Sequence, residues 1–125
     1  MTREEAADAL EKHARELADM EDRTEDAVAA YRVAADLRDE LGYTYHAAMD
    51  RTGARRLLVA EWARERWPDE MIIWEVVFPL LPSGGRRHGR LESWTFRVIG
   101  LTREGLDVRV RIDRHDRVRL LRSKT

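Results

Sequence analysis

The sequence predicts an α+β fold, in which a helical N-terminal half is followed by a four-stranded antiparallel β-meander. Apolar residues recur at three- and four-residue spacing up to about residue 66 and alternate with polar residues after Pro68. The length of 125 residues suits one compact unit, with a helical region expected at 1–67 and the meander at 71–125. Because 43% of the residues are apolar and 38% are charged, we expect a globular, soluble and cytoplasmic protein.

The first two helices are predicted at residues 2–20 and 24–41. Apolar residues, many of them alanine, recur on one face of each segment. Thr2 and Thr24 are placed to cap the two helices, since a threonine oxygen can accept a hydrogen bond from the first turn. Gly42 is expected to end the second helix, as glycine commonly does just past a helix.

Residues 43–62 read YTYHAAMDRTGARRLLVAEW and predict two shorter helices, at 44–52 and 55–66. Gly53 is expected to form the turn between them, because glycine adopts a positive φ at the lowest cost. Pro68 is expected to stop the second of these helices.

The rest of the chain predicts the antiparallel sheet. A first strand at about 71–79 precedes the basic loop PSGGRRHGR at 82–90. Three further strands alternate apolar and polar residues over 94–99, 106–113 and 117–120, so that one face of the sheet forms a core. The other face carries an arginine ladder, which consists of Arg97, Arg109, Arg111, Arg117 and Arg119.

Three interpretations of the arginine ladder are open. It can be a solvated face, a docking surface for an acidic partner, or a nucleic-acid platform. Like charges on neighbouring strands repel, which favours an acidic partner, either this chain's own N-terminal helices or those of a second copy. Residues 1–42 hold 6 basic and 13 acidic side chains, whereas residues 71–125 hold 12 and 6.

Nine residues of the stretch 43–62 fall in register, without a gap, on the spacing L-T-x-x-x-I-A-x-x-x-G-V-S-x-x-T-V-x-x-W. They are Tyr43, Thr44, Ala48, Met49, Gly53, Ala54, Arg55, Val59 and Trp62. The stretch therefore resembles the helix-turn-helix DNA-binding family, in its short bacterial form. With the preceding helix as the supporting helix, the resemblance covers about 24–66. It implies a small sequence-specific DNA-binding protein, a transcriptional regulator that binds double-stranded DNA as a homodimer.

The resemblance also implies which side chains touch DNA. Arg55 and Arg56 would read bases, since an arginine fork pairs with the acceptors of guanine. Contacts with phosphates are implied for Thr44, Tyr45, His46, Arg51 and Arg64. Leu57 and Leu58 stand where the family has small polar residues, which leaves an alternative open. In it the segment is a non-enzymatic protein-interaction or dimerisation module, with the two leucines as contacts for a protein partner.

The basic loop after these helices stands where a winged helix-turn-helix carries its wing. Wing tips touch the DNA backbone or the minor groove through basic residues. The contacts implied here are Arg86, Arg87, His88 and Arg90. The alternative is that the loop needs polar residues only for solubility.

No residues predict catalysis, and we expect no enzyme, cofactor, metal or membrane contact. The chain has no cysteine, and its carboxylates lie on helix faces expected to be solvated. His46 and Asp50 have a spacing that can share a metal ion, but no third ligand is evident, so a solvated pair is expected. Asp113 and His115 lie in a predicted turn, where such residues bind backbone groups.

Overall fold

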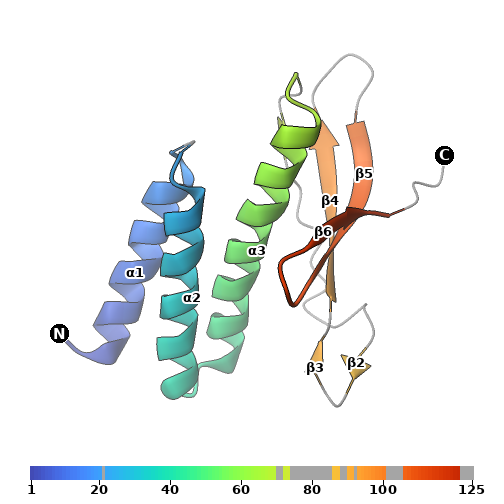
Figure 1. Ribbon diagram of the computed structural model, residues 1–125. Helices are drawn as coiled ribbons and strands as arrows, with labels where there is room; N and C mark the ends of the chain where they lie inside the picture. The colour runs from blue at the N-terminus through green and yellow to red at the C-terminus, as the bar shows by residue number, and fades with distance from the viewer. Residues whose placement is uncertain are drawn as a thin grey trace. The chain divides into compact units, whose positions relative to one another are not determined.

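The structure is a computed structural model that describes residues 1–20, 22–69, 72–73, 86–87, 90–91, 93–100 and 106–121. Three helices are followed by an antiparallel sheet (Figure 1), which confirms the predicted α+β class. The chain divides into two compact units, residues 1–58 and 59–125, and each is described by itself below.

The elements follow the chain in a simple order. The helices are α1 (Arg3–Ala18), α2 (Thr24–Glu40) and α3 (Thr44–Arg66). The strands are β1 (Ile72–Ile73), β2 (Arg86–Arg87), β3 (Arg90–Leu91), β4 (Ser93–Gly100), β5 (Leu106–Asp113) and β6 (Val118–Leu120). Within the described ranges, no helix combines the length and the apolar character needed to cross a bilayer.

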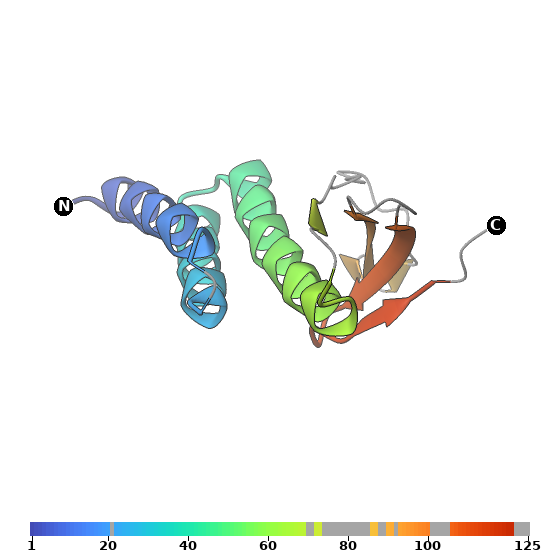
Figure 2. The same ribbon diagram turned by 90° about the horizontal axis from the view of Figure 1, so that it is seen from above.

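Helices α1 and α2 pack side by side in the first unit (Figures 1 and 2). The predicted cap of α1 is confirmed, because Thr2 Oγ1 accepts a hydrogen bond from the Glu5 backbone N–H at 3.1 Å. Small side chains dominate the interface and let the two backbones approach closely. The buried apolar residues are Ala7, Ala14 and Leu17 on α1, and Ala27, Val28, Ala30, Ala34 and Ala35 on α2.

The prediction is wrong for the first residue of α2 and correct for the residue that ends it. Thr24 is not a cap: it is the first residue of the helix and is buried, while Arg23 precedes it without a capping hydrogen bond from its side chain. Burial of the Thr24 side chain within the first unit thus outweighs the local preference of threonine for the cap position. At the other end Gly42 has a φ of 82°, which confirms that it terminates the helix in a left-handed conformation.

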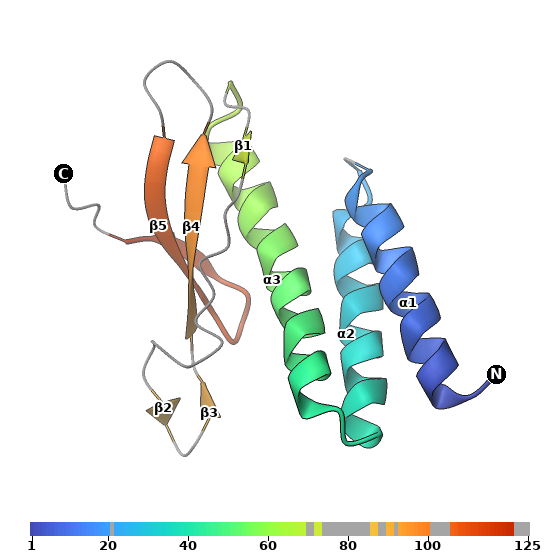
Figure 3. The same cartoon turned by 180° about the vertical axis from the view of Figure 1, so that it is seen from behind.

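The predicted turn at Gly53 is wrong, because α3 is one unbroken helix (Figures 1 and 3). A Cβ added at Gly53 would lie 3.2 Å from Cε1 of the Tyr31 ring on α2. The glycine therefore leaves room for an aromatic ring and does not provide a turn. Glycine inside a helix costs only about 1 kcal/mol relative to alanine, and the packing of Tyr31 offsets this cost.

The unbroken α3 removes the arrangement that the family resemblance implied. The separate helices predicted at 44–52 and 55–66 are two parts of one rod, so the described structure has no helix-turn-helix at 43–66. The local pattern misled because Gly53 satisfies two requirements equally well, a tight turn and a close contact between helices.

The second unit contains a three-stranded antiparallel sheet of β4, β5 and β6, and β1 pairs with the free edge of β4 (Figure 3). The predicted alternation is confirmed, since Phe96 lies opposite Val110 and both are buried. The buried apolar residues of this unit come from the sheet and from the end of α3. They are Val59, Ala60, Ala63, Phe96, Val98, Val110 and Ile112.

Part of the predicted sheet falls outside the described residues. Of the first strand, predicted at 71–79, the described part is Ile72–Ile73. Strands β2 and β3 pair with Arg87 opposite Arg90, so two short paired strands lie within the segment predicted as the basic loop. The side chains of Arg86, Arg87, His88 and Arg90, implied as wing contacts, lie outside the described residues.

Replacing Gly53 with alanine in a Tyr31→Ala background tests the unbroken helix. Without the ring, the new Cβ has room, and the higher helix propensity of alanine is expected to raise the free energy of unfolding by about 0.5–1 kcal/mol relative to Tyr31→Ala alone. Urea denaturation followed by circular dichroism measures the difference. If Gly53 occupied a turn with positive φ, the same change would lower the free energy of unfolding by about 1–2 kcal/mol.

Candidate functional site

One face of the β4–β5–β6 sheet carries the arginine ladder that the sequence predicted. Arg97 lies directly opposite Arg109 across β4 and β5, and Arg111 lies opposite Arg119 across β5 and β6. Both pairs alternate with the buried residues, so they occupy the face opposite the core. Like charges directly opposite one another destabilise a sheet, and this face therefore needs negative charge nearby.

Two aspartates supply part of that charge. Asp107 accepts two hydrogen bonds from Arg97, from Nε at 2.8 Å and from Nη2 at 2.6 Å, and these bonds lower the pKa of Asp107. Asp113 Oδ1 accepts from the backbone N–H groups of Arg117, at 3.1 Å, and His115, at 2.7 Å, which lowers the pKa of Asp113. The backbone-binding role predicted for this turn is thus confirmed for Asp113.

Three ladder arginines stand apart from the ion pairs formed in the described part of the sheet. Among the described residues, no carboxylate forms an ion pair with Arg109, Arg111 or Arg119. Arg109 and Arg119 are exposed, and the buried Nε of Arg111 has no hydrogen-bond partner in the described part of the chain. A guanidinium can bind two oxygens of one phosphate or carboxylate, so this face is suited to an anionic ligand.

The residues predicted to read bases lie in the middle of α3. Arg55 is half-buried and Arg56 is exposed, and neither lies in the first turn of a helix, from which helix-turn-helix proteins contact base edges. Leu57 and Leu58 are half-buried, so they do not form the open apolar surface that the protein-interaction alternative assumed.

Of the residues predicted to contact phosphates, Arg51 is already engaged within the first unit. Its Nη2 lies 2.9 Å from Asp36 Oδ1 and 2.5 Å from Asp39 Oδ2, both on α2. Burial alone would lower the pKa of Arg51, but these two carboxylates raise it. Arg51 therefore joins α3 to α2, whereas Arg64 is exposed near the end of α3 in the second unit.

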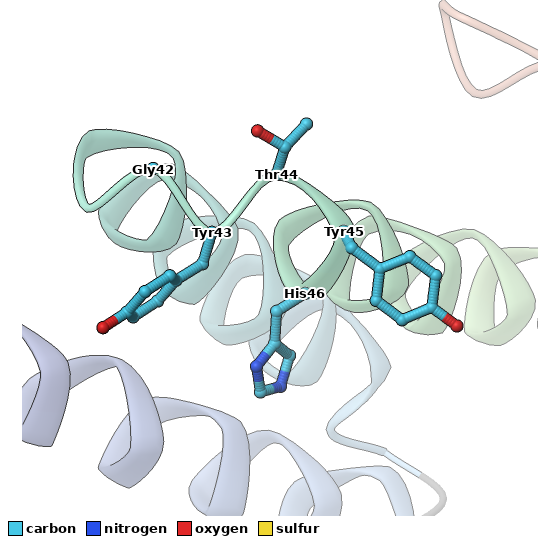
Figure 4. Close-up of a pocket in the computed structure, with 5 residues that line it drawn as sticks. All are labelled: Gly42, Tyr43, Thr44, Tyr45 and His46. Atoms are coloured by element: carbon cyan, nitrogen blue, oxygen red, sulfur yellow. The ribbon is translucent and has the colours of Figure 1, made fainter.

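Thr44, Tyr45 and His46, three further predicted phosphate contacts, line a shallow hollow of about 500 Å³ at the start of α3 (Figure 4). Gly42 and Tyr43 complete its lining. The rings of the two tyrosines point in different directions, with the imidazole of His46 between them. The lining includes no arginine or lysine.

A buried guanidinium joins the three helices of the first unit. Arg38 on α2 is 2% exposed. Its Nη2 donates a hydrogen bond to Asp8 of α1 at 2.8 Å, and its Nη1 donates to Asp50 of α3 at 2.5 Å. Nη1 also lies 3.3 Å from Glu11 Oε1 of α1. Each helix thus contributes at least one charged group to the same cluster.

The charges of this cluster shift one another. Burial alone would lower the pKa of Arg38, but hydrogen bonds to its three carboxylates raise it. Asp50 is 1% exposed, and burial raises its pKa to about 6. For Glu11, partial burial acts in the same direction but is outweighed by the neighbouring Asp50 carboxyl and by the cations Arg38 and Arg15, so its pKa is lowered.

Sequence reasoning missed how His46 and Asp50 are used. The predicted solvated pair is wrong for Asp50, whose Oδ1 is buried and has no hydrogen-bond partner within the described residues. Glu11 joins the two from α1, and one ligand atom of each residue lies within 4.8 Å of the other two. The spacing of His46 and Asp50 was visible in the sequence, but only the packing of α1 brings in Glu11.

Replacing Arg38 with methionine is expected to lower the free energy of unfolding by about 3–5 kcal/mol, because Asp50 would remain buried without its cation. Urea denaturation measures this loss. Arg3 provides the control: it pairs with Glu40 at 3.2 Å, but the two side chains are 69% and 55% exposed. Arg3→Met is expected to cost no more than about 1 kcal/mol, and an equal loss in both variants would contradict the role given to Arg38.

Comparison with known proteins found no matching family model, no matching characterised protein and no matching solved structure.

Proposed function

We propose that this chain is a DNA-binding protein in which the arginine ladder, and not a helix-turn-helix, contacts the phosphates of double-stranded DNA. The observation that carries the proposal is the cross-strand opposition of Arg97 with Arg109 and of Arg111 with Arg119. Such pairs repel in the isolated sheet, and a polyanion that neutralises several of them at once removes the repulsion.

The chemistry of the ladder supports a phosphate backbone as the partner. The guanidinium fork binds phosphate oxygens in pairs, and each phosphate contact releases counterions from the duplex, which drives binding. The two aspartates on this face do not cancel its charge, because five arginines against Asp107 and Asp113 leave a net positive charge.

Phosphate contacts supply affinity and orientation but little sequence information. Sequence-specific regulation therefore needs a second basic element, and the segment that contains β2 and β3, with Arg86, Arg87 and Arg90 in its sequence, takes this role in the proposal. One ladder covers few base pairs, so two copies of the chain are expected on one site.

Arg109→Gln together with Arg119→Gln is expected to weaken binding to duplex DNA at least tenfold at low salt. The loss of two phosphate contacts should also reduce the slope of log K against log salt by about 1.8. Fluorescence anisotropy of a labelled duplex, titrated at several salt concentrations, measures both quantities.

Arg55→Ala with Arg56→Ala is the matched control, because it also removes two arginines. The ladder proposal expects this variant to bind DNA within about twofold of the parent. A duplex affinity lost in the Arg55/Arg56 variant and kept in the Arg109/Arg119 variant would contradict it, as would the absence of binding at low salt.

A second function is favoured by one observation, the segregation of charge between the units. Residues 1–58 hold 9 basic and 14 acidic side chains, and residues 59–125 hold 14 and 10. The ladder is thus complementary to the acidic helical unit of a second copy, and a contact between the two would make the chain a self-association module. Because this contact joins two different surfaces, it can close into a dimer or continue into larger assemblies.

Light scattering separates this second function from DNA binding. Self-association through the ladder predicts an oligomer at low salt that dissociates at high salt and in the Arg109→Gln/Arg119→Gln variant. A monomer at low salt, without DNA, would exclude self-association and leave the DNA-binding proposal unaffected.

A further inference from the structure

The cluster in the first unit contains more carboxylates than guanidinium groups. Asp8, Glu11 and Asp50 face the guanidinium of Arg38, and Arg15 Nη2 lies 3.6 Å from Glu11 Oε1, so three carboxylates share two guanidinium groups. Buried charges are normally paired or bind a metal ion. The need for a further positive group is most evident at Asp50 Oδ1, because this atom is buried and accepts no hydrogen bond from the described residues.

We infer that Glu11, His46 and Asp50 form a binding site for one divalent transition-metal ion of the Zn²⁺ type. Each residue offers one ligand atom, and the three atoms lie within 4.8 Å of one another. An imidazole nitrogen with two carboxylate oxygens is a ligand set that Zn²⁺ accepts, whereas Mg²⁺ prefers oxygen ligands and water. The site is independent of the ladder in the second unit.

The geometry requires only a small adjustment to close around an ion. Metal–ligand distances of about 2.1 Å place ligand atoms no more than about 4.2 Å apart. His46 Nε2 is already 3.4 Å from Glu11 Oε1. The ligand atoms lie within 4.8 Å of one another, and Glu11 has three side-chain torsions with which to adjust, so the movement needed is short.

Arg38 supports the site and does not block it. Its Nη1 holds Asp50 through Oδ2, which leaves Oδ1 for the ion. Residues that bind a metal ligand through its second atom fix the orientation of that ligand. Arg38 and Arg15 together supply two guanidinium groups for three carboxylates, so the cluster can accept a further cation.

The imidazole gives the ion a route from solvent. The His46 side chain is 47% exposed and also lines the hollow at the start of α3 (Figure 4). Three protein ligands leave a coordination position for water on this side. The bound ion would join α1 to α3 directly, so metal binding is expected to stabilise the first unit.

The test is isothermal titration of the untagged full chain, stripped of metal with a chelator, with Zn²⁺ and separately with Mg²⁺. We expect one Zn²⁺ per chain, a rise in the melting temperature with Zn²⁺ concentration, and no binding of Mg²⁺ over the same range. Glu11→Gln and His46→Ala are each expected to weaken Zn²⁺ binding at least about tenfold. Both variants avoid the buried Asp50, and circular dichroism without metal checks that they fold.

His13→Ala is the matched control, because His13 is an exposed histidine on the same helix as Glu11. It is expected to keep the parent affinity for Zn²⁺. Three results would overturn the inference: no Zn²⁺ binding at millimolar concentration, binding that survives both Glu11→Gln and His46→Ala within twofold, or binding lost in His13→Ala.

Discussion

The first unit is organised around the buried guanidinium of Arg38, and the positions of its three helices depend on it. A guanidinium that is 2% exposed must have carboxylates around it, and these come from α1 and α3. The alanine-rich contact between α1 and α2 allows close packing, but small side chains alone do little to specify a register. A buried ion cluster adds little net stability compared with apolar packing, but breaking it is costly. We infer that Arg38 selects one register among those that the alanines permit.

Most of the fold could be predicted from local pattern, because its elements follow local rules. The helical periodicity, the terminating Gly42 and the alternation of the sheet are each visible in a few neighbouring residues. The structural role of Gly53 could not be predicted in this way, because the glycine makes room for the ring of Tyr31 on another helix. The same limit applies to the candidate sites. The arginine ladder follows from alternation alone, whereas the position of Glu11 beside His46 and Asp50 depends on tertiary packing.

The distribution of ion pairs explains why the proposed DNA contact moves from α3 to the sheet. In the first unit the predicted phosphate contact Arg51 already binds two carboxylates of α2, and Arg38 binds three. In the sheet, Arg109 and Arg119 face other arginines. An external anion gains more from unpaired cations than from cations that must first give up a partner. The surplus of negative charge around Arg38 has the opposite consequence, since it favours a bound cation.

The coupling energy between Arg38 and Asp50, measured in a double-mutant cycle of urea unfolding, tests most directly the claim that this ion pair organises the first unit. The cycle uses Arg38→Met, Asp50→Leu and the double variant. Two groups that depend on each other in a buried site should show a coupling of about 2–3 kcal/mol, with the double variant more stable than the sum of the single losses predicts. A coupling below about 0.5 kcal/mol would mean that the two groups act independently, and it would contradict the account.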